Sequence, residues 1–243
     1  MVTASFVFYA ELNDFLPANR RGMPAVLSYA SHQTLKHLIE SLGVPHVEIG
    51  SLLVDGQSAP PSLKPPHGSR VEVFPGHSLP PEGASFVLDN HLGRLAAYLR
   101  MLGLDTLYRN DYHDPELAEV ASQEGRILLT RDRRLLMRKA LLYGYCIRHL
   151  EPLAQLAEVL QRYHLPAPFT QAELGFQRCL RCNSLLQPVS KQSVLERLQP
   201  LTRLYFEEFY LCPVCDQIYW KGSHVDHMQA MLRSIGNPGA EYN

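Results

Sequence analysis

The chain has 243 residues, of which 46% are hydrophobic and 19% charged, and its formal net charge is -1. This near-neutral balance excludes a global electrostatic attraction to nucleic acid, so a polyanionic partner has to meet a local basic patch. No apolar run approaches the roughly 20 residues that cross a bilayer, and the first residues lack the basic start and cleavage site of a signal peptide. These features predict a cytoplasmic protein without a membrane partner.

Residues 1–76 are predicted to form a small β-grasp domain. Apolar strands surround one helix, whose leucine and isoleucine residues recur at helical spacing from Leu35 to Leu42. An Asp-Gly turn at 55–56 joins two of the strands. This layout resembles ubiquitin-like proteins and small sulfur carriers, which work through a free C-terminal Gly-Gly. Here the last strand runs on through Gly76, so the resemblance implies a fused docking module for a protein partner. A packing domain without a ligand is the alternative.

Residues 85–165 alternate between short apolar strands and amphipathic helices, which gives four β-α units. One helix has clear end signals, with Asp114 at the N-cap, Pro115 at the first position and Gly125 beyond the last turn. Strands that are apolar throughout predict a parallel sheet with helices on both faces. The expected strands are 85–89, 106–109, 126–130 and 145–149, and the expected helices are 92–103, 115–125, 134–144 and 151–164.

Two C-x2-C pairs predict a zinc module at residues 176–235. The pairs are separated by 29 residues, and a reducing compartment favours metal binding over disulfides. A redox pair explains one C-x-x-C but not two, and cysteines that merely pack are the other alternative. Four thiolates fill the coordination sphere of zinc, so the ion is expected to be structural. The expected ligands are Cys179, Cys182, Cys212 and Cys215.

Aspartates follow the predicted strands of the middle region. Asp89 ends the first strand, Asp132 lies just past the third, and Asp111 and Asp114 lie in the loop after the second. In open parallel sheets, ligands bind beyond the carboxyl ends of the strands, and carboxylates suit Mg²⁺ or Mn²⁺. Helix capping is the alternative role of Asp114 and of Asp132. Asp105 begins a strand at the opposite edge and is not expected to be a ligand.

Basic side chains are expected around the same edge. Guanidinium groups grip phosphates through paired hydrogen bonds, and Arg94, one turn after Asp89, is the best placed to lean over the site. His91 is a candidate to touch substrate, although a plain surface histidine is the alternative. For the arginines the alternative is a solvated helix face with local ion pairs. The basic set is Arg94, Arg100, Arg109, Arg131, Arg133, Arg134, Arg138 and Lys139.

Several motifs together resemble one known family. They are FVLDNHLGRLAAYLRMLGLDT, DPELAEVASQEGRILLTRDRRLL, the two C-x2-C pairs and YWKGSH, and they are similar to the Mut-7 C-terminal ribonuclease domain family. The resemblance implies a PIN-like fold with an appended zinc ribbon, preceded in many bacterial members by a ubiquitin-like domain. It also implies a metal-dependent ribonuclease with Asp89, Asp114 and Asp132 as its acidic residues and Arg94 and Arg131 as basic partners. No fourth carboxylate can be placed, which leaves the number of catalytic metal ions open.

The resemblance also gives the zinc module a role. Zinc ribbons commonly grip nucleic acid or a partner, and Tyr219 or Trp220 is suited to stack on an unpaired base. In the alternative, Trp220 packs the ribbon against the nuclease core. His224 and His227 are not needed when four cysteines are present. Arg178, Arg181 and Lys221 are the expected phosphate contacts.

The leading hypothesis is a Mg²⁺- or Mn²⁺-dependent ribonuclease that hydrolyses RNA. Asp89, Asp114 and Asp132 hold the ion, and water attacks the phosphodiester. The zinc ribbon positions the strand, while the RNA backbone is held by Arg94, Arg131 and Arg134. A non-catalytic RNA- or protein-binding adaptor with the same fold is the main alternative, and a small-molecule phosphatase is a third.

Overall fold

The computed structural model describes residues 1–76, 79–80, 83–165 and 177–222. Contacts between residues divide the chain into two compact units. One comprises Met1–Gly83 and Asp114–Cys146, and the other comprises Ala84–His113 and Ile147–Asn243. The boundaries of the three regions inferred from the sequence stay a prediction. Among the described helices, none has the length and apolar character needed to span a membrane.

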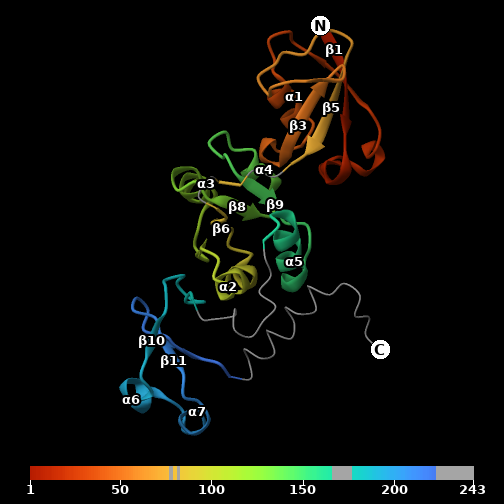
Figure 1. Cartoon of the computed structure of the whole chain (residues 1–243). Coiled ribbons are helices and arrows are strands. Elements are labelled where there is room, and N and C mark those ends of the chain that lie inside the picture. Colours follow the sequence, from red (N-terminus) through yellow and green to blue (C-terminus); the bar gives the residue numbers. More distant parts are fainter. Residues whose placement is uncertain (77–78, 81–82, 166–176, 223–243) are drawn as a thin grey trace, which may run out of the picture. The chain divides into compact units, whose positions relative to one another are not determined.

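The N-terminal sheet has the strand order β2-β1-β5-β3-β4. Its central pair, β1 and β5, is parallel, whereas the β1–β2, β3–β5 and β3–β4 pairs are antiparallel (Figure 1). This arrangement confirms the predicted β-grasp. The elements are β1 (Val2–Phe8), β2 (Ala25–Tyr29), α1 (Leu35–Ser41), β3 (Ile49–Val54), β4 (Gln57–Ser58) and β5 (Ser69–Pro75), with short helices η1 (Ala10–Phe15), η2 (Ala18–Arg20) and η3 (His46–Glu48).

The core of the β-grasp domain follows from the two periodicities of its elements. Alternate residues of β1, including Phe6 and Phe8, are buried, as strand geometry requires. Leu35, Leu38 and Ile39 share the buried face of α1, and each such side chain contributes roughly 1.5–3 kcal/mol when it leaves water. The chain before α1 is extended, and the Thr34 hydroxyl accepts a hydrogen bond from the amide of His37 at 3.4 Å.

Two glycines meet where β5 leaves the β-grasp domain. A Cβ placed on Gly76 would lie 2.1 Å from the Cα of Gly50, a distance that no side chain tolerates. Gly50 lies at a register shift in the pairing of β3 with β5, and the Gly76 amide donates a hydrogen bond to the Glu48 carbonyl at 3.1 Å. Backbone contacts therefore hold the end of β5 close to the start of β3.

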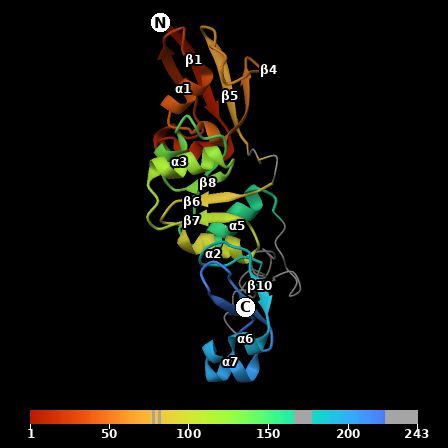
Figure 2. The ribbon, with the colours of Figure 1, turned by 90° about the vertical axis from the view of Figure 1, so that its left-hand side faces the viewer.

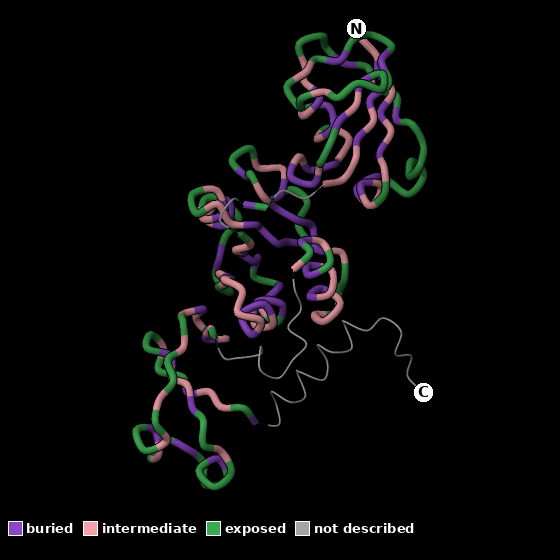
Figure 3. The backbone as a smooth tube through the Cα atoms, viewed as in Figure 1, coloured by how far each residue is buried: buried purple, intermediate pink, exposed green. Residues whose placement is uncertain are grey.

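Four short strands form a second sheet, in the order β7-β6-β8-β9. The β6–β7 and β8–β9 pairs are parallel, and every residue of β6 and β8 is buried (Figure 3), which confirms the prediction of a parallel sheet with helices. Figure 2 shows α2 beside β7. The elements are β6 (Phe86–Leu88), α2 (Gly93–Met101), β7 (Thr106–Tyr108), α3 (Asp114–Gln123), β8 (Ile127–Thr130), α4 (Arg133–Leu136), β9 (Gly144–Cys146) and α5 (Pro152–Arg162).

The helix predicted at 134–144 is wrong in its length, because α4 ends at Leu136. The Met137 amide bonds to the Arg134 carbonyl and the Leu141 amide to the Arg138 carbonyl, so i to i+3 turns replace the helical ladder. These turns bury Leu141. Tertiary packing of this leucine therefore outweighs the helical propensity of the segment.

The third sheet, β10-β11-β12, is antiparallel and belongs to the cysteine-bearing region. Its small core contains Val194, Leu198, Phe209 and Ile218, and Trp220 packs against it. The indole is 6.5 Å from the ring of Phe209, so Trp220 packs within the ribbon. The elements are β10 (Gln187–Val189), α6 (Lys191–Val194), η4 (Leu195–Arg197), α7 (Pro200–Tyr205), β11 (Phe209–Leu211) and β12 (Ile218–Trp220).

Candidate functional site

Four cysteine sulfurs converge in the C-terminal ribbon. All of them lie within 4.8 Å of one another, and in the part of the chain that the structure describes this is the one metal-capable group of three or more His, Cys, Asp or Glu side chains. The sulfurs of a tetrahedral zinc site lie about 3.8 Å apart, given Zn–S bonds of about 2.3 Å. The four thiolates therefore fit a structural zinc ion. The shortest separations are Cys179–Cys215 at 3.4 Å and Cys182–Cys212 at 3.3 Å.

The two C-x2-C pairs repeat one turn geometry. Asn183 and Asp216 directly follow the pairs, and both adopt positive φ values, 72° and 60°. Their amides bond back to the carbonyl of the first cysteine, at 2.9 and 3.0 Å. Each turn also aims an amide at the first sulfur of its pair. These contacts are Cys182 N to Cys179 Sγ at 3.5 Å and Cys215 N to Cys212 Sγ at 3.4 Å.

The surroundings of the sulfurs favour a shared cation. Burial raises the pKa of Cys182, but hydrogen bonds with Ser184, Cys212 and Cys179 together outweigh it and bring the value to about 6. Burial raises the pKa of Cys215 to about 12. Like charges at this spacing repel, so the four sulfurs become thiolates together only when a divalent cation binds. The Tyr219 hydroxyl lies 3.1 Å from Cys179 Sγ, which places this residue beside the sulfurs rather than on a free stacking surface.

Asp89 follows β6 and is buried, with 7% of its surface exposed. Its Oδ1 accepts hydrogen bonds from the His91 amide at 2.8 Å and from His91 Nδ1 at 3.0 Å. The His91 side chain is 81% exposed. A buried carboxylate is costly unless it is hydrogen-bonded or bound to a cation. The two bonds from His91 therefore offset part of the cost of burying Asp89. This bond to Asp89 is neither the substrate contact nor the plain surface position that the sequence indicates for His91.

The other aspartates lie in the first unit or in the loop before α3. Asp132 is exposed and caps α4, since its Oδ1 accepts the Arg134 amide at 2.7 Å. Asp114 is exposed and is the first residue of α3. Asp111 is held by two hydrogen bonds from Arg109, at 2.9 and 3.0 Å, which hold the pKa of its carboxyl below the usual value. The capping role of Asp132 is therefore real, and its role as a metal ligand stays a prediction.

The predicted basic residues divide into two groups. The guanidinium groups of Arg94, Arg131 and Arg134 are exposed and make no hydrogen bond or ion pair within the described residues. Arg100, by contrast, is buried, and Arg133 donates to the backbone carbonyls of the β-grasp domain. The expectation that Arg100 would face a polyanion is wrong, because its guanidinium group is buried against backbone carbonyls. Arg133 is exposed, and its contact with a polyanion stays a prediction.

The basic residues of the ribbon divide in the same way. Arg178 donates to the Gly103 carbonyl at 3.1 Å and lies 3.3 Å from Asp105, so it has an internal role. Arg181 is exposed and stays a candidate phosphate contact. Lys221 lies 3.9 Å from Glu208. The two histidines considered as extra ligands, His224 and His227, lie outside the described residues.

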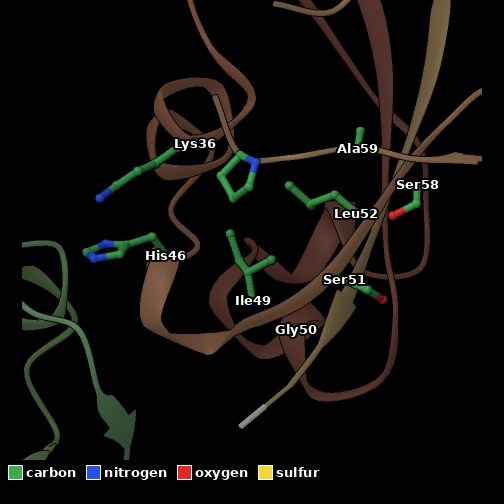
Figure 4. A pocket seen from close by; sticks show the side chains of 9 residues that line it. Lys36, His46, Ile49, Gly50, Ser51, Leu52, Ser58 and Ala59 are labelled. Atoms are coloured by element: carbon green, nitrogen blue, oxygen red, sulfur yellow. The ribbon is translucent and has the colours of Figure 1, made fainter. Parts of the chain in front are cut away.

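Two hollows lie in the first unit. One, of about 430 Å³, lies in the β-grasp domain, where Ile49 and Leu52 give it an apolar lining beside Lys36 and His46 (Figure 4). It has no carboxylate among its lining residues, so it lacks the ligands of a hard cation. The second, of about 480 Å³, lies beside α3 and is lined by Pro115, Glu119, Arg138 and Lys139, among others.

Comparisons with known proteins bear on both halves of the chain. A family model described as the Mut7-C RNAse domain matches residues 84–232, and one described as Mut7-C ubiquitin matches residues 1–79. No curated protein matches the chain. The crystal structure of H. volcanii small archaeal modifier protein 1 aligns with a TM-score of 0.26 and 16% identity, and it covers 31% of this chain and 98% of that one. Since the first model spans more than half of the sequence, the chain belongs to the Mut7-C RNAse domain family.

Proposed function

We propose that the protein is a Mg²⁺- or Mn²⁺-dependent ribonuclease with Asp89, Asp114 and Asp132 as its acidic residues. The observation that carries this proposal is the match of residues 84–232 to the Mut7-C RNAse domain, which supports a ribonuclease role and RNA as the partner. The buried Asp89 directly follows β6. Asp132 follows β8, and in parallel sheets the carboxyl ends of the strands are the usual place for a ligand.

The chain supplies two kinds of group for this reaction. A hard divalent cation, when bound, supplies charge for the phosphodiester and a more acidic water. Asp89 is suited to hold such an ion because its carboxylate is already ordered by His91. Arg94, Arg131 and Arg134 are exposed and unpaired among the described residues. They therefore keep their full hydrogen-bonding capacity for RNA phosphates.

Cleavage of labelled single-stranded RNA tests the proposal. The purified protein is expected to degrade RNA with Mn²⁺ or Mg²⁺ and not with EDTA. Asp89→Asn is expected to lower the rate by more than the roughly 10- to 100-fold that the loss of an outer-shell partner costs. Asp111→Asn is the matched control and should keep activity, because Arg109 already holds that carboxylate. Full metal-dependent activity of Asp89→Asn would show that the site is wrongly assigned.

A non-catalytic RNA-binding adaptor is the second candidate. The observation in its favour is that Asp132 has a complete structural role as the cap of α4. Such an adaptor would bind RNA equally in EDTA and in magnesium and would leave it intact. Comparing RNA, DNA and a simple phosphate ester as substrates separates the ribonuclease from both the adaptor and a phosphatase. The β-grasp domain remains the proposed place for a protein partner.

A further inference from the structure

A buried arginine links α2 to the first cysteine pair. Arg100 is 2% exposed, and its Nη1 donates to the carbonyls of Leu180 and Arg181 at 2.9 and 3.0 Å. These are the two residues between Cys179 and Cys182. Its Nε donates to the Thr106 carbonyl at 2.9 Å. One guanidinium group therefore joins strand β7 to the turn that carries two of the zinc ligands.

A second set of hydrogen bonds supports the same junction. The Thr106 amide donates to Asn183 Oδ1 at 3.0 Å, and Asn183 Nδ2 donates to Asp105 Oδ1 at 2.9 Å. Arg178 reaches the Gly103 carbonyl, also in the turn between α2 and β7. Asn183 is itself buried and directly follows Cys182. The first cysteine turn is thus bonded to the α2–β7 turn through both backbone and side chains.

The charge of Arg100 has an unusual environment. All its hydrogen-bond acceptors among the described residues are backbone carbonyls, and burial lowers the pKa of its guanidinium, whereas Cys179 and Cys182 act in the opposite direction. A buried cation without a carboxylate partner is costly. Four thiolates around one Zn²⁺ carry a net charge of about -2, so the zinc site supplies the anion that Arg100 otherwise lacks.

The second cysteine pair is held differently. Arg197 grips the turn after this pair through Asp216, at 3.0 Å to Oδ1 and 2.6 Å to the carbonyl. Arg197 is exposed, and it lies in η4 of the ribbon. This arginine therefore belongs to the same chemical type as Arg100 but joins the ribbon only to itself, which makes it a matched control.

We propose that Arg100 is a positioning residue that couples zinc binding at the four cysteines to the order of the α2–β7 segment. Coupling between two sites is reciprocal. Loss of the Arg100 charge weakens zinc binding, and loss of zinc loosens β7. The inference concerns zinc and the fold alone, so it holds or fails independently of RNA cleavage.

Competition for zinc with a chromogenic chelator tests the first direction. Arg100→Met keeps most of the apolar stem and removes the charge, and it is expected to weaken zinc binding by about tenfold or more. Arg197→Met is expected to change it by less than about threefold. If both variants bind zinc equally well, the proposal is overturned. Asn183→Gly serves if Arg100→Met does not fold, because glycine keeps the positive φ while the bonds to Thr106 and Asp105 are lost.

Hydrogen exchange on the unaltered protein tests the other direction. After zinc is removed with a chelator, the amides of Thr106–Tyr108 are expected to exchange at least tenfold faster, while those of β1 keep their rate as an internal reference. An unchanged rate throughout β7 would contradict the coupling even if the ribbon itself unfolds. Equal acceleration of β1 and β7 would also overturn it, because it would indicate global unfolding rather than a local link.

Discussion

The β-grasp domain and the zinc ribbon are both attached to the β-α units by charged side chains, but with different burial. In the first unit, Arg133 is exposed and donates to the Asp14 and Phe15 carbonyls at 2.9 and 3.2 Å. In the second unit, Arg100 is buried and binds the carbonyls of the first cysteine turn. An exposed hydrogen bond competes with water, whereas loss of a buried one leaves carbonyls unsatisfied. The ribbon junction is therefore expected to be the more sensitive of the two.

The first unit also contains a buried polar side chain, that of Glu48. Glu48 of η3 has no exposed surface, and it accepts the Cys146 amide of β9 at 2.6 Å. His46 of the same short helix donates from Nε2 to the Leu141 carbonyl at 2.9 Å. The β-grasp domain thus has its own buried polar side chain, which accepts from a backbone amide, whereas Arg100 at the ribbon junction donates to backbone carbonyls. The comparison predicts a graded series of effects.

Loss of one zinc ligand is expected to have the largest effect. Cys212→Ser removes a thiolate from the site, and because metal binding and folding of such modules are coupled, the variant should lose bound zinc and unfold in the ribbon. Metal analysis and thermal unfolding measure both changes. Cys146→Ser is the control, since this buried cysteine lies outside the cluster and its variant should keep one zinc per chain. Full zinc content in Cys212→Ser would show that zinc binding does not require this cysteine.

Removal of the buried Glu48 side chain should rank second. Glu48→Ala takes away the acceptor that lies 2.6 Å from the Cys146 amide, and a buried donor left unsatisfied costs about 1–3 kcal/mol. We expect the free energy of unfolding in urea to fall by that amount. Glu48→Gln keeps an oxygen acceptor and should lose about half as much. Equal stability of the alanine variant and the unaltered protein would mean that the β-grasp junction does not depend on this bond.

The smallest effect is expected at the exposed arginine. Arg133→Ala removes two hydrogen bonds and a contact 5.2 Å from the Phe15 ring centre, which together should lower stability by about 1 kcal/mol. Arg131→Ala, two residues before Arg133 and without a partner among the described residues, should change it by less than about 0.5 kcal/mol. Urea unfolding of both variants measures the two losses of stability. A larger loss for Arg131→Ala would reverse the assigned roles.

Local patterns predicted most of the helices and strands, and the four cysteines converge as a shared metal site requires. The spacing of Cys179 and Cys182 is enough to form a metal-binding turn, and the alternation in β1 or the apolar run of β8 reports burial directly. Arg100 was misplaced for a physical reason. Its acceptors are backbone carbonyls, which every residue carries, so no side chain in the sequence marks the partner. The length of α4 was wrong because burial of Leu141 depends on tertiary contacts.

The sequence predicted the acidic site only in part. The positions of Asp89 and Asp132 after strands were visible in the sequence, and the structure places both there. The bond from His91 to Asp89 depends on the local loop conformation, which the sequence pattern does not specify. The metal role of the aspartates stays a prediction that the cleavage assay tests.

The contact between Gly50 and Gly76 bears on the chemistry open to the β-grasp domain. A carrier presents its last glycine on a tail that reaches into the active site of another enzyme. Here the Gly76 amide is bonded to the Glu48 carbonyl and its Cα lies against Gly50. Even if the chain were cleaved directly after Gly76, its terminal glycine would stay bonded to the residues beside β3. It could not extend into the active site of another enzyme to transfer an activated carboxylate.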